Sequence, residues 1–106
     1  MIHVSFRYVK SEHVGDVVAW LNEVNTVRRS DAVTTLITEG VRHETAHLID
    51  TTDGPILVYA METDDIEHAR AVGEVSLADV DRRHKAVMRT ADNGPVPVRA
   101  LLDLYP

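Results

Sequence analysis

The sequence predicts a single α+β domain, in which a four-stranded antiparallel sheet is covered by helices on one face. Three observations predict this fold class. Apolar residues at positions 2, 4, 6 and 8 alternate with polar ones, which is the period of a half-buried strand. Helical patterns follow this segment and also follow a continuous apolar run at residues 56–61. The chain has 106 residues, 44% of them hydrophobic, so it can form one modest core.

The first half of the chain is predicted to contain one strand and two helices. After the strand that starts at Ile2, Ser11 is placed to cap a helix. The apolar face of this helix is formed by Val14, Val17, Val18, Leu21 and Val24, with Trp20 beside it. A shorter helix is predicted to restart at Ser30 and Asp31 and to end at Gly40, because glycine readily adopts the left-handed conformation that closes a helix.

The middle of the chain is predicted to form a hairpin of two strands. Residues 41–50 and 56–62 flank the turn-rich sequence Thr-Thr-Asp-Gly-Pro at residues 51–55. The second of these strands is continuously apolar at first, which indicates a central strand buried on both faces.

Two further helices and a last strand complete the predicted fold. Capping boxes at Asp64–Glu67 and Ser76–Asp79 open the helices, and the second helix extends to about Ala91. The last strand is predicted at residues 96–105. The order is therefore β-αα-β-β-αα-β, whose two β-α-β halves give the ferredoxin-like arrangement.

Composition excludes several classes of function. The chain has no cysteine, so it can form neither a disulfide framework nor a thiolate metal site. Its net charge of −6 argues against nucleic acid as a partner, since phosphate binding needs a basic patch. No signal peptide and no segment of membrane-spanning length is recognisable. We therefore expect a cytoplasmic protein without a membrane partner.

Residues 43–47 read His-Glu-Thr-Ala-His and so match the HExxH signature of zinc metallopeptidases. On a helix, the two histidines would bind one zinc ion and the glutamate would act as a general base. Asp53 and Glu67 stand at positions where a third ligand could follow. A metallopeptidase is therefore one alternative for this chain.

The surroundings of this motif favour a strand instead. Gly40 before it and the turn at residues 53–55 after it leave a window of strand length. In a strand, His43 and His47 would lie on one face roughly 13 Å apart, too far to share a zinc ion, and Glu44 would point to the other face. We therefore interpret the match as accidental and predict no metal site.

The sheet face that the helices leave uncovered still carries apolar residues. A second copy of the chain is an economical way to bury it, so we expect a homodimer with a pocket in the barrel between two sheets. We assign the apolar residues of the first strand to the helix-packed face. The polar residues that would then point into the barrel are His3, Ser5, Arg7, Glu44, Tyr59, and Arg99 or Asp103.

The predicted ligand-binding residues are Arg7, Glu44, Tyr59 and His84. An arginine, a carboxylate and a phenol that converge on a cavity could bind a small anionic or hydroxylated ligand. Arg7 and Glu44 could instead form a structural ion pair or contact solvent, which is the commoner role of such residues.

His84 is the candidate catalytic residue. It falls at helical spacing on the face of Leu77, Val80, Val87, Met88 and Ala91, which should point inward. Such a histidine could act as a general base, with Asp81 one turn earlier to orient it. A packing role with a satisfied ring is the alternative, and it is the commoner one.

Residues 35–44 and 53–61, with Asp65 and the run Asp-Arg-Arg-His at 81–84, resemble a family of uncharacterised prokaryotic proteins of about this length. The layout of that family is similar to the dimeric α/β-barrel superfamily, which includes cofactor-free monooxygenases, sugar mutarotases and haem-degrading enzymes. The resemblance implies a fold and a homodimer, and it carries no particular reaction with it. We predict no cofactor. It leaves open an isomerase or a monooxygenase-like enzyme that uses His84 with Arg7, Glu44 or Tyr59.

Overall fold

The computed structural model describes the whole chain, residues 1–106. Its elements are β1 (Ile2–Val9), a short 3-10 helix η1 (Ser11–His13), α1 (Val14–Asn25), α2 (Arg29–Glu39), β2 (Val41–Thr51), β3 (Gly54–Thr63), α3 (Ile66–Val75), α4 (Asp79–Ala91) and β4 (Asp92–Pro95). The predicted order β-αα-β-β-αα-β is confirmed. No helix has the length and apolar character needed to cross a membrane.

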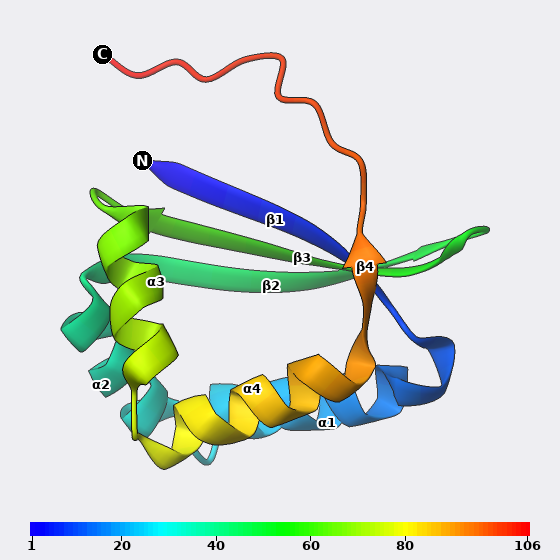
Figure 1. Cartoon of the computed structure of the whole chain (residues 1–106), viewed down its shortest axis with the longest axis horizontal. Helices are drawn as coiled ribbons and strands as arrows, with labels where there is room; N and C mark the ends of the chain where they lie inside the picture. The colour runs from blue at the N-terminus through cyan, green and yellow to red at the C-terminus, as the bar shows by residue number, and fades with distance from the viewer.

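The strands form one antiparallel sheet in the order β2-β3-β1-β4. The helices lie together on one side of this sheet, and the C-terminal segment runs along the other side (Figure 1). The structure is therefore a two-layer α+β domain, as the sequence predicts.

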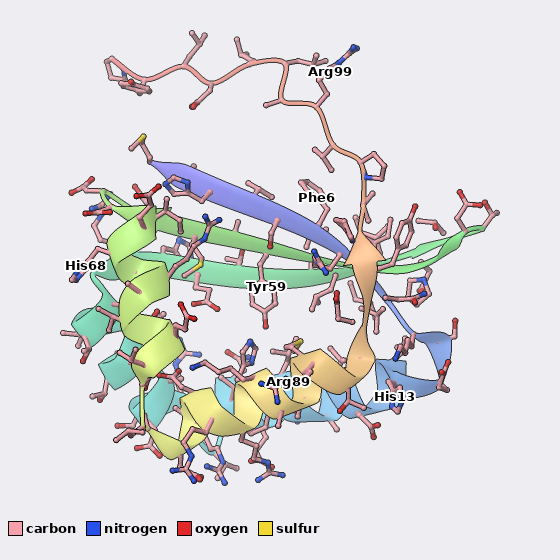
Figure 2. All side chains as sticks on the ribbon, in the orientation of Figure 1. Phe6, His13, Tyr59, His68, Arg89 and Arg99 are labelled. Carbon is pink, nitrogen blue, oxygen red and sulfur yellow. The ribbon has the colours of Figure 1, made fainter.

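The prediction of which side of β1 faces the helices is wrong. Ser5 pairs with Tyr59 and Arg7 pairs with Leu57, and paired residues share a face of the sheet. Leu57 is buried against the helices, so the polar residues of β1 face the helices as well. Ile2, Val4 and Phe6 of β1 occupy the open face, where 68% of Ile2 is exposed. Figure 2 shows Phe6 on the open side and Tyr59 on the helix side. Alternation reveals two faces but not which one is covered.

The last strand also differs from its prediction. β4 comprises only Asp92–Pro95, and residues 96–106 have no regular secondary structure. One backbone hydrogen bond, from the amide of Val96 to the carbonyl of Phe6 at 3.0 Å, continues the contact with β1. Pro95 and Pro97 have no N–H group to donate, so the hydrogen-bond ladder ends between them. Arg99 lies on the segment that leads away from the sheet (Figure 2).

Helix ends were predicted better than helix starts. Gly40 ends α2 with a φ of 75°, the left-handed conformation expected for it. The N-cap of α3 is Asp65 rather than Asp64, and its carboxylate accepts the backbone N–H three residues later at 2.9 Å. Ser11 begins η1 instead of capping α1, and Ser76 accepts a backbone hydrogen bond in the turn before α4. Helix starts can use backbone turns in place of a side-chain cap, and sequence alone does not distinguish the two.

The core lies at one end of the space between the layers. Its centre is formed by Val9, Val17, Leu57 and Ala91, which are 1–4% exposed. These residues come from β1, α1, β3 and α4, so the core fastens both strands to both long helices. At the other end of the same space, the packing gives way to a cavity.

Candidate ligand-binding cavity

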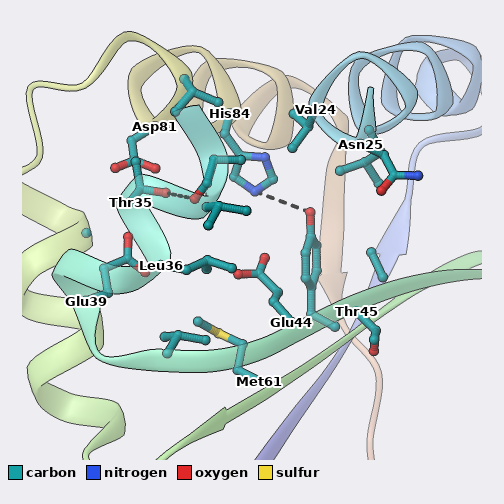
Figure 3. Close-up of a pocket in the computed structure, with 18 of the residues that line it drawn as sticks. Val24, Asn25, Thr35, Leu36, Glu39, Glu44, Thr45, Met61, Asp81 and His84 are labelled. Carbon is teal, nitrogen blue, oxygen red and sulfur yellow. Dashed lines mark hydrogen bonds between the residues drawn. The ribbon is translucent and has the colours of Figure 1, made fainter. Parts of the chain in front are cut away.

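A cavity of about 1050 Å³ separates the sheet from α2 and α4. Its polar lining includes Glu39 from α2, Glu44 from β2, Tyr59 from β3, and Asp81 and His84 from α4. Apolar residues complete the wall, among them Leu36, Val41, Met61 and Val80. Several of these side chains converge on the same space (Figure 3). We call this space the interlayer cavity.

A bulge at the start of β2 directs Glu44 into the cavity. Val41 pairs with Thr63 and His43 pairs with Glu62, so the register shifts by one residue between them. As a result, both Val41 and Glu44 face the helices, although regular alternation would put them on opposite sides. The sequence-based prediction placed Glu44 in a barrel between two copies of the chain, whereas the structure places it between the sheet and the helices of the same chain.

The strand interpretation of the HExxH match is confirmed. His43 and His47 lie on β2 and pair with Glu62 and Val58 of β3, which places both histidines on the open face. Glu44 pairs with Met61 on the other face. No group of three or more His, Cys, Asp or Glu side chains is arranged to hold a metal ion. The helix that a metallopeptidase motif requires is not formed.

Three half-buried carboxylates line the cavity without a protein partner. Glu39, Glu44 and Asp81 form none of the chain's side-chain hydrogen bonds or ion pairs. Burial raises the pKa of Glu39 to about 7, and the charges of Asp81 and Glu44 add to the effect, while Lys85 opposes it. The pKa of Glu44 is raised by burial and then by Asp81. This end of the cavity therefore favours a proton or another positive charge.

His84 joins helix α1 to the sheet through both of its ring nitrogens. The indole Nε1 of Trp20 donates to Nδ1 at 2.9 Å, and Nε2 lies 3.3 Å from the hydroxyl of Tyr59. Figure 3 marks the second bond with a dashed line from His84. Burial lowers the pKa of His84, and Asp81 opposes this, so the ring is neutral at neutral pH. Leu77, predicted to share its face, precedes α4 and is exposed.

Tyr59 keeps its hydroxyl proton at any physiological pH. Its pKa is raised by burial and then by the charge of Glu44. The phenol therefore serves as a hydrogen-bonding group in the cavity and not as an anion.

Arg7 does not belong to the interlayer cavity. Its Nε and Nη2 atoms donate to the two carboxylate oxygens of Asp92 on β4, at 2.8 and 2.6 Å. This bidentate pair raises the pKa of Arg7 and lowers that of Asp92. The alternative pairing of Arg7 with Glu44 is therefore not formed. Arg99 and Asp103, the remaining candidates, lie in the exposed C-terminal segment.

Two groups of the site were missed from the sequence: Glu39, which lines the cavity, and Trp20, which donates to His84 without lining the cavity itself. Glu39 precedes the glycine that ends α2, and nothing in this position indicates a cavity. Trp20 carried a usable signal, because a buried indole N–H needs an acceptor and Trp20 is only 4% exposed. The three cavity residues that were predicted, Glu44, Tyr59 and His84, do lie together.

Comparison with known proteins gives one match. Residues 3–102 match the model of a family of unknown function, DUF6176. No curated protein and no solved structure matches the chain at a significant level.

Proposed function

The chain belongs to the family DUF6176, whose function is unknown, and from its site we propose that it binds a small organic molecule in the interlayer cavity. The observation that carries this proposal is the set of carboxylates Glu39, Glu44 and Asp81, which face a cavity and have no partner in the chain. Charged groups in folded proteins are normally paired when water is partly excluded from them. A ligand is the partner that this arrangement lacks.

The charge of the cavity selects the kind of ligand. With Arg7 paired elsewhere, the anionic ligand considered from the sequence loses the arginine predicted for it. Two other arginines line the cavity, but Arg42 is paired with Glu62 and Asp64, and Arg29 donates to the side chain of Asn25. Lys85 lines the cavity, but its ammonium donates to the backbone carbonyl of Glu74 at 2.7 Å. Because its pKa is raised, Glu39 tends to hold a proton, and a protonated amine would replace that proton as the positive partner of the carboxylate. The apolar wall, with Leu36 and Met61, suits a hydrocarbon portion of the same molecule.

The geometry supports binding better than general-base catalysis by His84. A general base needs an unshared ring nitrogen within reach of a substrate proton. In this chain Nδ1 accepts from Trp20, and Nε2 is bonded to Tyr59. An isomerase or monooxygenase-like reaction through His84 would first have to break one of these bonds.

We also propose that two copies of this ferredoxin-like domain pack through their open faces, as in a dimeric α/β barrel. The open face presents Ile2, Val4 and Ile49, each with 45% or more of its surface exposed. Leu101 and Leu102 of the C-terminal segment are exposed as well. Apolar area of this kind is normally buried against a partner. Light scattering should give a dimer mass that Val4→Asp reduces to a monomer, and a monomeric wild type would contradict the proposal.

Calorimetry with three matched probes tests the binding proposal. 2-Phenylethylamine, 2-phenylethanol and 3-phenylpropionate share a phenyl group but carry a cation, a neutral hydroxyl and an anion. The amine should bind most tightly and the anion should not bind. Glu44→Gln should weaken amine binding about tenfold or more, since hydrogen bonds to charged groups contribute about 1.5–3 kcal/mol.

The matched control is Glu62→Gln, which removes the same charge from the open face of the sheet. It should leave the affinity for the amine unchanged. Equal binding of all three probes, or equal effects of the two substitutions, would contradict the proposed ligand class.

A further inference from the structure

The hydrogen bonds that join Trp20, His84 and Tyr59 can run in only one direction. An indole N–H donates and cannot accept, so Nδ1 of His84 must accept the bond from Trp20. A neutral imidazole carries one N–H, which then has to be on Nε2. That N–H points to the Tyr59 oxygen 3.3 Å away, so the phenol accepts the bond. The direction is fixed by Trp20, whose side chain is 4% exposed.

This direction leaves the hydroxyl proton of Tyr59 free. The hydroxyl forms no other hydrogen bond within the chain, and Tyr59 lines the interlayer cavity. A buried hydroxyl proton without an acceptor costs free energy. A ligand in the cavity can supply this acceptor.

We propose that Tyr59 acts as a hydrogen-bond donor to the ligand, so that the ligand carries a neutral oxygen acceptor in addition to its amine. This inference rests on the proposed function, because it names a second recognition element of the same site. Glu44, which also lines the cavity, disfavours a negatively charged acceptor through charge repulsion. The ligand class is therefore an amine that also bears a carbonyl, an ether or a hydroxyl oxygen.

Trp20 and His84 are positioning residues in this arrangement. His84 contacts Tyr59 directly, and Trp20 acts on Tyr59 through the ring of His84. Together they determine which way the hydroxyl proton of Tyr59 points. The edge-on contact of the Tyr59 and His84 rings, with centroids 5.8 Å apart at 89°, holds the same geometry.

A pair of probes tests the role of Tyr59. 4-Acetylphenethylamine and 4-ethylphenethylamine differ in the carbonyl oxygen and are otherwise close in shape. The acetyl compound should bind about fivefold more tightly to the wild type, the effect of one net hydrogen bond. Tyr59→Phe should abolish this difference by weakening the acetyl compound alone. Equal binding of both compounds to the wild type would overturn the inference, whereas failure of both to bind would overturn the proposed function and the inference with it.

A measurement without ligand tests the direction of the bonds separately. Nitrogen-15 NMR of the labelled protein should show His84 neutral, with its proton on Nε2. In Trp20→Phe, the Nδ1 nitrogen loses its donor, so the tautomers should mix and the pKa of His84 should rise. A proton on Nδ1 in the wild type would overturn the inference whatever the probes do. If Trp20→Phe does not fold, the wild-type spectrum alone decides.

Discussion

The two ends of the layer between sheet and helices are built in opposite ways. At the closed end, Val9, Val17, Leu57 and Ala91 exclude water, and Arg7 pairs with Asp92 beside them. At the open end, a cavity of about 1050 Å³ lies between the sheet and the helices, and its carboxylates have no partner in the chain. The same strands, β1 and β3, take part in both ends, so the difference arises from side chains and not from topology.

The pKa shifts show what this difference means. The guanidinium of Arg7 lowers the pKa of Asp92, as expected for a carboxylate that is paired within the chain. Burial raises the pKa of Glu39 to about 7, as expected for a carboxylate that has no partner in the chain and is available to a ligand. The closed end thus serves stability, and the open end is available for function.

The largest expected effect of a substitution on stability is at the closed end. Leu57→Ala should lower the free energy of unfolding by about 3 kcal/mol, because it opens a cavity in a packed cluster. Met61→Ala, four residues along the same strand, should cost only about 1 kcal/mol because its side chain already borders empty space. Urea denaturation compares the two variants. Equal losses would mean that the open end is packed as tightly as the closed end.

The next effect is a pH dependence that comes from Glu39. Its folded pKa of about 7 lies above its ordinary value of 4.5, so the folded state binds more protons between these values. Stability should therefore fall as pH rises through this window. Glu39→Gln should remove the fall and add about 1 kcal/mol at about pH 8, once solvent screening is allowed for. Denaturation curves across the window check this, and identical pH profiles of variant and wild type would contradict it.

The smallest expected effect is at the exposed ion pair of the closed end. Arg7→Ala should cause a slight loss of stability that disappears in high salt, because exposed ion pairs are screened. It should not change the binding of 2-phenylethylamine, since Arg7 does not line the interlayer cavity. Thermal melts at low and high salt, with calorimetry, measure both quantities. Weaker binding in this variant would mean that Arg7 contributes to the binding site and that the two ends do not act separately.

Much of the site could be predicted from the sequence because it depends on local pattern. The breaks at Gly40 and residues 53–55 identify β2 as a strand in spite of its HExxH match. Helical spacing puts His84 on the inner face of α4. What could not be predicted depends on contacts between distant segments. The pairing of Arg7 with Asp92 spans 85 positions in the chain, and no local sequence pattern predicts it.

The errors have physical causes of the same kind. The wrong face of β1 was assigned to the helices because alternation separates the two faces of a strand but does not show which one is covered. A strand was predicted at residues 96–105, but Pro95 and Pro97 lack the N–H donors that a hydrogen-bond ladder would need.

The most direct test of the central claim, that the open end is the binding site, is an NMR titration with 2-phenylethylamine. Chemical shifts should change at Glu39, Glu44, Tyr59 and His84, and the signals of Arg7 should stay in place. Shift changes confined to the open face of the sheet, or no changes at all, would contradict the account.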